Sequence, residues 1–273
     1  MKLVKPLASL VIFAASLFLV AGCTPSAPSA SSTGEPPKVQ VVEINVSAAL
    51  GLKEVLLDIQ KNYATLQPNV KIVYNFAAAG ALQAQIEQGA PTDVFLSAAV
   101  KQMDELQKKN LIKAETRKNL VGNQLVLVVP QNSTLNIKDF KDLTQPGVQH
   151  FGLGAPETVP AGEYGIEVLK SLGVWETVKS KAVLGKDVRT LMAYAETGNA
   201  EASIIFSTVA ATSDKVKIVA TAPPGSHRPI IFPGVVLAAS KQPKAAAEFL
   251  NYLSSPDGMK VFVKYGFNPL TKN

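Results

Sequence analysis

The chain has 273 residues, with 27 basic and 21 acidic side chains and an aromatic content of 7%. Residues 1–22 contain two lysines and no acidic side chain, so the remainder has a net charge of 25 − 21 = +4. No run of five basic residues occurs, whereas a nucleic-acid groove normally combines clustered Lys and Arg with aromatic side chains. The composition therefore argues against a nucleic-acid partner, and the small positive excess favours an anionic partner only weakly.

The first residues have the pattern of an export signal. Lys2 and Lys5 precede a mostly apolar run over residues 7–20, which is shorter than the ~20 residues that a membrane-spanning helix needs. The run ends in the sequence VAGC at residues 20–23, which resembles a bacterial lipobox. We predict a lipoprotein signal peptide over residues 1–22 and lipid attachment at Cys23. The alternative is a transmembrane anchor with an incidental cysteine.

Cys23 is the only cysteine, so the chain has no internal disulfide and no metal cluster built on cysteines. Residues 24–38 are rich in Pro, Ser and Ala and lack apolar periodicity, which is typical of a disordered tether. Residues 23–38 are therefore predicted to be a lipidated cysteine and its tether. The two acyl chains of a diacylglyceryl group would anchor an exported protein to the cell membrane, facing the periplasm or the cell exterior.

The rest of the chain alternates short β-branched segments with segments of helical periodicity. In chain order we predict a strand at 41–46, a helix at 50–66, a strand at 70–76, a helix at 81–88, a strand at 93–97 and a helix at 100–109. Strands at 124–130 and 152–154, helices at 162–172 and 188–198, and strands at 202–206 and 216–220 follow. An apolar segment at 230–239, interrupted by Pro233 and Gly234, precedes helices at 245–253 and 257–265.

This alternation predicts an α/β protein with mostly parallel sheets flanked by helices. In such folds ligands bind beyond the carboxyl ends of the strands, often at helix N-termini. Most of the loops that follow strands are rich in Gly, Ala, Ser and Thr, whose small side chains let backbone N–H groups approach a ligand. The loops that we expect to matter are 47–51, 77–80, 155–162, 185–189 and 207–210. They predict an anion site with little formal charge of its own.

Five segments resemble the molybdate-binding proteins of bacterial ABC importers, in the order in which that family has them. The most specific pieces are IEQGAPTDVF (86–95) and VPAGEY (159–164), because generic α/β patterning does not produce them. The full segments are SAALGLKEVLLDI (47–59), NFAAAGALQAQIEQGAPTDVFLSA (75–98), APETVPAGEYGIEVLKSLGVW (155–175), KDVRTLMAYAETGNAEASIIFS (186–207) and EFLNYLSSPDGMKVFVKYGF (248–267). The similarity covers nearly the whole predicted folded region.

The resemblance implies a two-lobed, type II periplasmic-binding-protein fold with a hinge between the lobes. Lobe I would comprise residues 40–122 plus 228–273, and lobe II residues 123–227. It implies a monomeric, non-enzymatic receptor that binds molybdate or tungstate as a tetrahedral oxyanion and passes it to an ABC permease and ATPase complex. It implies no cofactor and no direct metal-cation ligands.

In that family five positions supply neutral donors to the oxyanion. The alanine of the PAG turn corresponds to Ala161, and the valine of the D-V-R turn to Val188; both would act through backbone N–H. The other three positions depart from the family. Gly51 and Ala79 stand where the family has serines, and Phe206 stands where it has a tyrosine. Because a hydrogen bond to a charged group is worth about 1.5–3 kcal/mol, losing three hydroxyl donors implies weakened or altered selectivity.

Three alternatives remain open at this point. The scaffold could have a drifted pocket for a different solute, or it could serve as a non-transport surface sensor or adhesion module. Neighbouring hydroxyls at Ser47, Ser97, Thr158, Ser207 and Thr208 could replace the missing donors.

Other polar residues point more weakly to a function. Arg189 either reaches the ligand or pairs with an acid such as Asp187. Glu163 and Tyr164 are interpreted as helix-start and packing residues. His150 and His227 lie far apart and predict no zinc site. No G-x-S-x-G motif is present, so nothing supplies a nucleophile with its base and we predict no enzymatic activity.

Overall fold

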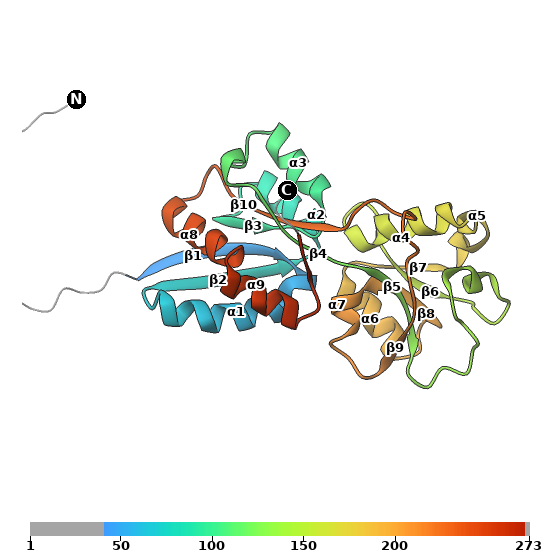
Figure 1. Ribbon diagram of the computed structural model, residues 1–273. Helices are drawn as coiled ribbons and strands as arrows, with labels where there is room; N and C mark the ends of the chain where they lie inside the picture. Colours follow the sequence, from blue (N-terminus) through green and yellow to red (C-terminus); the bar gives the residue numbers. More distant parts are fainter. Residues whose placement is uncertain (1–40, 271–273) are drawn as a thin grey trace, which may run out of the picture. The chain divides into compact units, whose positions relative to one another are not determined.

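The computed structural model describes residues 41–270, and its strands form two separate sheets (Figure 1). The first has the strand order β11-β4-β10-β3-β1-β2 and the second the order β7-β6-β8-β5-β9. The predicted signal peptide, the lipid attachment at Cys23 and the tether lie outside the described residues. Within the described part, no helix is both long and apolar enough to span a membrane.

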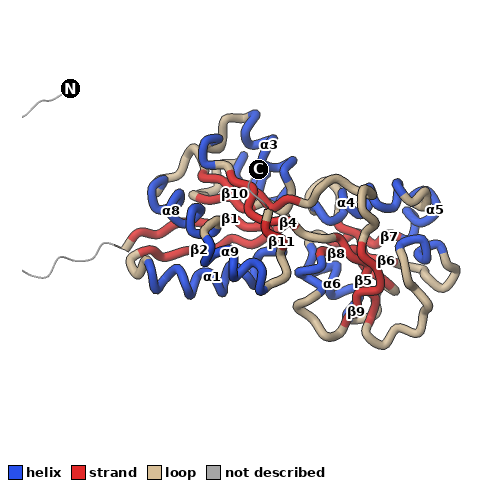
Figure 2. The backbone as a smooth tube through the Cα atoms, in the orientation of Figure 1, coloured by secondary structure: helices blue, strands red, loops and turns tan. Residues whose placement is uncertain are grey.

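The first sheet carries helices on both faces (Figure 2). Its strands are β1 (Val42–Ala49), β2 (Val70–Ala77), β3 (Val94–Leu96), β4 (Lys118–Gly122), β10 (Ile231–Val236) and β11 (Asn268–Pro269). Its helices are α1 (Lys53–Leu66), α2 (Ala79–Glu87), α3 (Val100–Lys108), α8 (Pro243–Leu253) and α9 (Pro256–Lys264), with short 3-10 turns η1 (Leu50–Leu52) and η2 (Ala114–Thr116).

The second sheet is also flanked by helices. Its strands are β5 (Leu125–Pro130), β6 (Phe151–Gly154), β7 (Ala182–Gly185), β8 (Ala202–Phe206) and β9 (Val216–Thr221). Its helices are α4 (Pro160–Ser171), α5 (Trp175–Val178), α6 (Val188–Glu196) and α7 (Ser207–Ala210), with 3-10 turns η3 (Phe140–Thr144) and η4 (Lys179–Lys181).

Both sheets are mixed, whereas the alternation of segments predicted mostly parallel sheets. Strand β1 pairs in parallel with β2 and β3, and β6 pairs in parallel with β7 and β8. Strand β10 runs antiparallel to β3 and β4, and β5 runs antiparallel to β8 and β9. The βαβ alternation predicted the parallel pairs. Strands β5 and β10 are the first strands after the chain crosses from one sheet to the other. The periodicity of the helices does not predict the antiparallel direction of these two strands.

Strand β5 shows why a continuous apolar run becomes a central strand. Leu125, Val126, Leu127 and Val128 are at most 1% exposed, and the strand lies between β8 and β9. A strand covered on both faces buries every side chain, so its sequence loses the alternation of a half-exposed strand. Strands β4, β7 and β11, of five, four and two residues, were not predicted from the sequence.

The chain passes between the two sheets twice, at residues 122–125 and at residues 221–231. Strands β1–β4, β10 and β11 belong to one sheet and strands β5–β9 to the other. The resemblance implied a lobe I at 40–122 plus 228–273 and a lobe II at 123–227, and this division stays a prediction.

Candidate functional site

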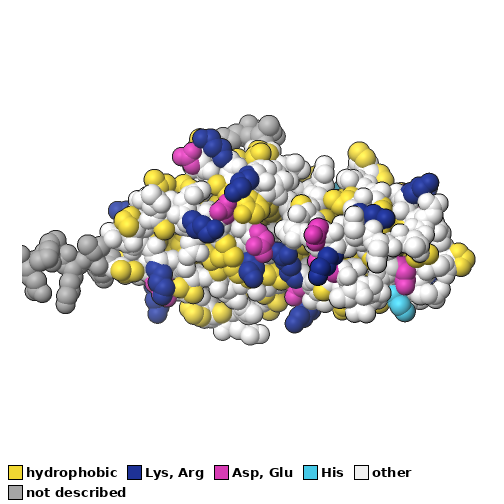
Figure 3. Space-filling model, turned by 90° about the horizontal axis from the view of Figure 1, so that it is seen from below, with side chains coloured by type: hydrophobic (Ala, Val, Ile, Leu, Met, Phe, Trp, Pro, Cys, Tyr) yellow, Lys and Arg dark blue, Asp and Glu magenta, His cyan; other side chains and the backbone are white. Residues whose placement is uncertain are grey.

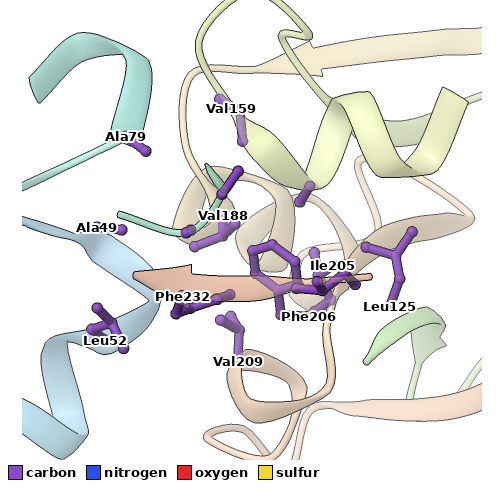
Figure 4. Close-up of a cluster of buried hydrophobic side chains, with 14 of the residues drawn as sticks. Ala49, Leu52, Ala79, Leu125, Val159, Val188, Ile205, Phe206, Val209 and Phe232 are labelled. Carbon is purple, nitrogen blue, oxygen red and sulfur yellow. The ribbon is translucent and has the colours of Figure 1, made fainter. Parts of the chain in front are cut away.

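A small cavity lies where elements of the two sheets meet. It is lined by Ala49, Leu50, Gly51, Ala78, Ala79, Ala98, Val159, Pro160, Asp187, Val188 and Phe206. The volume of the cavity is about 10 Å³, which is room for about one water molecule. In Figure 4, Ala49 and Ala79 come from the first sheet's elements, and Val159, Val188 and Phe206 from those of the second. The closed cavity therefore suits only a very small solute.

Three helices of eight or more residues begin at this cavity. Helices α2, α4 and α6 start at Ala79, Pro160 and Val188, and all three of these residues are among its lining. The first backbone N–H groups of a helix have no partner within the helix, and they carry its positive dipole end. The N–H groups of Ala79, Ala161 and Val188 have no acceptor among residues 41–270. Their arrangement is suited to an anion.

The cavity lining contains a single charged side chain, Asp187, which is already engaged. Asp187 is the N-cap of α6, and its Oδ1 accepts hydrogen bonds from the Thr190 backbone N at 2.7 Å and from the Thr190 Oγ1 at 3.0 Å. The bond from the Thr190 backbone N–H satisfies one of the free N–H groups at the start of α6, and the N–H of Val188 stays available. Asp187 thus shapes the first turn of the helix.

We expect Asp187→Ala to lower the free energy of unfolding by about 1 kcal/mol, because the cap of α6 is lost. Asp187→Asn retains an oxygen that can accept from Thr190, and it should stay closer to the wild type. Urea unfolding followed by circular dichroism measures both values. Equal stability of the Ala variant and the wild type would show that the cap contributes nothing.

The structure brings four of the five sequence-predicted residues to the cavity: Gly51, Ala79, Val188 and Phe206 line it. Ala161 is fully buried beside the lining residue Pro160. The roles of all five as ligand donors remain predictions. Of the lining residues, only Ala98 lies outside the loops and candidate residues that the sequence singled out. Ala98 follows β3, so the rule that ligands bind beyond strand ends would have found it.

The nearby hydroxyls considered as replacements mostly have other partners. Ser47 Oγ is 2.9 Å from Thr92 Oγ1, and Ser97 Oγ donates to Ala99 O at 2.8 Å. Ser207 Oγ donates to Asn123 Oδ1 at 3.0 Å, and Thr208 Oγ1 accepts from Asn123 Nδ2 at 2.9 Å. None of these four side chains lines the cavity, and neither does Thr158. An oxyanion there would therefore depend on backbone N–H donors.

Arg189 and Lys101 pair with carboxylates from the other sheet's elements and do not line the cavity. Arg189 Nη2 on α6 contacts Glu54 Oε1 on α1 at 2.7 Å, so Arg189 pairs with Glu54 and not with Asp187. Lys101 on α3 pairs with Glu163 on α4. Basic and acidic side chains also lie beside one another on the face seen in Figure 3. Because such partly exposed pairs are worth at most about 1 kcal/mol, they stabilise the contact between the two sheets' elements only modestly.

Glu163 and Tyr164 do more than start a helix. Glu163 pairs with Arg228 as well as with Lys101, and Arg228 also pairs with Glu167. The Arg228 guanidinium carbon lies 4.7 Å from the centre of the Tyr164 ring. Burial raises the pKa of Tyr164 to about 12, so its hydroxyl stays protonated at neutral pH. Arg228 thus attaches the 221–231 connection to the helix that begins at the cavity.

No group of three or more His, Cys, Asp or Glu side chains suited to a metal ion occurs among residues 41–270. His227 lies against Tyr164, with ring centres 5.8 Å apart, and its Nδ1 is 2.6 Å from Arg228 O. His227 therefore packs at the connection between the sheets.

Comparison with known proteins assigns the class. The model of the family "Bacterial extracellular solute-binding protein" matches residues 44–268, so the chain belongs to this family. It is 42% identical to the "Putative ABC transporter substrate-binding lipoprotein YvgL" of Bacillus subtilis, over 94% of this chain and 96% of that protein. It is 38% identical to the "Molybdate-binding protein ModA" of Haemophilus influenzae, over 83% of this chain and 90% of that one.

A solved structure agrees with this class. The "substrate binding domain of putative molybdenum ABC transporter from Clostridium difficile" is 40% identical, with a TM-score of 0.67, and is covered over 99% of its chain and 84% of this one. These comparisons confirm the predicted fold class and the resemblance to molybdate-binding proteins. The chain is a solute-binding protein of an ABC transporter. It is a binding protein rather than an enzyme, as predicted.

Proposed function

We propose that the protein captures a tetrahedral oxyanion, molybdate or tungstate, in the cavity between the two sheets and delivers it to an ABC permease and its ATPase. The observation that carries this proposal is the convergence of the α2, α4 and α6 N-termini, with the free N–H groups of Ala79, Ala161 and Val188, on one small cavity. Relatives named as molybdate-binding proteins support the choice of ion.

The chemistry of the lining supports an anion bound by neutral donors. Of the side chains that line the cavity only Asp187 is charged, and its carboxylate caps α6. Three helix dipoles stabilise a negative charge without a counter-cation, each by roughly 0.3–1 kcal/mol when exposed and up to about 2 kcal/mol when partly buried. The small size of the cavity argues against a sugar or a peptide as the ligand.

The same lining implies weaker binding than in relatives that keep the hydroxyls. Gly51, Ala79 and Phe206 offer no side-chain donor, and each missing bond to a charged ligand is worth about 1.5–3 kcal/mol. Three such losses amount to several powers of ten in affinity, which backbone donors and water offset only in part. We therefore expect binding, with a dissociation constant higher than that of a site with all five donors.

Delivery would follow from closure of the two lobes around the ion. Ligand binding that favours the closed arrangement shifts the population of lobes toward it, and a permease can recognise that form. The lipid on Cys23 would hold the exported receptor, as a monomer, at the membrane near its permease. A tether of about 15 residues keeps its effective concentration there high, which makes a modest affinity sufficient for transport.

Isothermal titration of the full, mature protein with molybdate, tungstate and sulfate tests the proposal. We expect saturable binding of molybdate and tungstate with one ion per chain. Thermal unfolding gives a second readout, because an ion that binds only the folded state raises its stability. Absence of both heat and a thermal shift with all three ions would refute the oxyanion proposal and favour a different solute.

A further inference from the structure

Gly80, the second residue of α2, contacts the loop that precedes α4 of the second sheet. The Gly80 backbone N donates a hydrogen bond to Thr158 O at 2.9 Å, so α2 of the first sheet is joined to the loop before α4. A Cβ atom on residue 80 would lie 2.6 Å from Thr158 Cα, 2.9 Å from Thr158 O and 3.2 Å from Glu157 O. Such distances are below van der Waals contact, so this arrangement admits no side chain at position 80.

The atoms on the other side of this contact are backbone atoms, which cannot move aside as a flexible side chain would. The requirement for glycine does not come from the conformation of residue 80 itself. Its φ is not positive; among residues 41–270 the glycines with a positive φ are Gly89, Gly173, Gly198, Gly225 and Gly266. Position 80 is the second residue of α2, where alanine is a better helix former than glycine. Only the meeting of the two lobes demands glycine here.

The contact is adjacent to the candidate donors on both sides. Ala79, whose N–H is free, precedes Gly80 directly, and Val159 and Pro160 at the cavity follow Thr158. The separation between Gly80 and Thr158 therefore fixes how far the start of α2 lies from the start of α4. A change of a few tenths of an ångström at this contact would alter the cavity between those two helix ends.

We infer that the Gly80–Thr158 contact is the stop that ends lobe closure and sets the size of the closed cavity, so that Gly80 is a positioning residue for the ligand. This inference rests on the proposed function for its effect on oxyanion binding, but its effect on closure is independent of the ligand. An alanine at position 80 stops closure before the lobes reach the wild-type separation, because its methyl group would contact Thr158. In the open form the lobes are further apart, so the methyl group has room.

The variant that tests this is Gly80→Ala, with Thr158→Ala as the matched control. The contact uses backbone atoms of Thr158, so Thr158→Ala should close and bind like the wild type. Closure is measured by cross-linking Lys101→Cys to Glu163→Cys with a short bifunctional maleimide, because these two residues pair across the lobes. Every sample carries Cys23→Ser to leave only the two engineered thiols. Thermal unfolding checks that each variant is folded.

We expect Gly80→Ala to slow the cross-linking at least about tenfold and to raise the dissociation constant for molybdate by about tenfold or more, the effect of losing one hydrogen bond to a charged ligand. Unchanged cross-linking in Gly80→Ala overturns the inference, as does an absence of cross-linking in the parent pair. The protein with Gly80 unchanged could bind no oxyanion while Gly80→Ala still slows cross-linking. That result would refute the proposed function but would support the Gly80–Thr158 contact as the stop.

Discussion

Ala79→Pro should bind molybdate about 10- to 100-fold more weakly than the wild type, while the protein stays folded. Proline removes the N–H of residue 79, which would donate to the ion, and a hydrogen bond to a charged group is worth about 1.5–3 kcal/mol. Residue 79 is the first of α2, the position at which helices accept proline best. Ala78 has φ −63° and ψ 144°, an extended conformation that a following proline requires.

The control for this variant is Ala79→Gly, which removes the methyl group but keeps the N–H. It should retain most of the affinity for molybdate, at a small cost in stability. Calorimetric titration gives both dissociation constants, and circular dichroism gives the unfolding temperatures. If the proline variant binds as tightly as the glycine variant, the backbone N–H of residue 79 is not a ligand donor.

The second large effect that we expect is an increase in the affinity for molybdate. Gly51→Ser combined with Ala79→Ser restores the hydroxyls that the resembling family has at these positions, and we expect about 100-fold tighter molybdate binding from two added hydrogen bonds. The site has room for the first change. A Cβ at position 51 would lie 3.6 Å from Val209 Cγ2, 3.8 Å from Phe206 Cδ2 and 4.0 Å from Val188 Cγ2, which are ordinary contacts.

A serine placed on the exposed side of the same helix, Ala84→Ser, serves as the matched control, since it adds a hydroxyl to α2 away from the cavity. Its dissociation constant should equal that of the wild type. An unchanged or weaker affinity in the Gly51→Ser, Ala79→Ser variant would mean that the site has adapted to a ligand that does not accept these hydrogen bonds. Titration with sulfate in parallel reports whether selectivity changes with affinity.

The sequence predicted the elements that position the site. The loops after the strands, with their Gly, Ala, Ser and Thr residues, are where the structure places the cavity. Helix α2 begins at Ala79, two residues before its predicted start at residue 81, because Ala79 and Gly80 lack the apolar periodicity that signals a helix. This difference matters, because it makes Ala79 the first residue of a helix whose N-terminal N–H groups are free.

Contacts between distant segments could not be predicted in this way. Arg189 was expected to bind the ligand or an acid such as Asp187, and it pairs with Glu54, 135 residues away in the chain. Gly80 meets Thr158 only because the two sheets approach each other, and periodicity within one segment carries no information about that approach. The partners of Ser207 and Thr208 at Asn123 depend equally on how the chain crosses between the sheets.

The most direct measurement is a crystal structure of the protein with molybdate, with anomalous scattering used to locate the metal. We expect one molybdenum peak per chain in the cavity between the starts of α2, α4 and α6, within hydrogen-bonding reach of the N–H groups of Ala79, Ala161 and Val188. A peak elsewhere on the protein, or a closed cavity that remains free of molybdenum at saturating concentration, would contradict the assignment of this site.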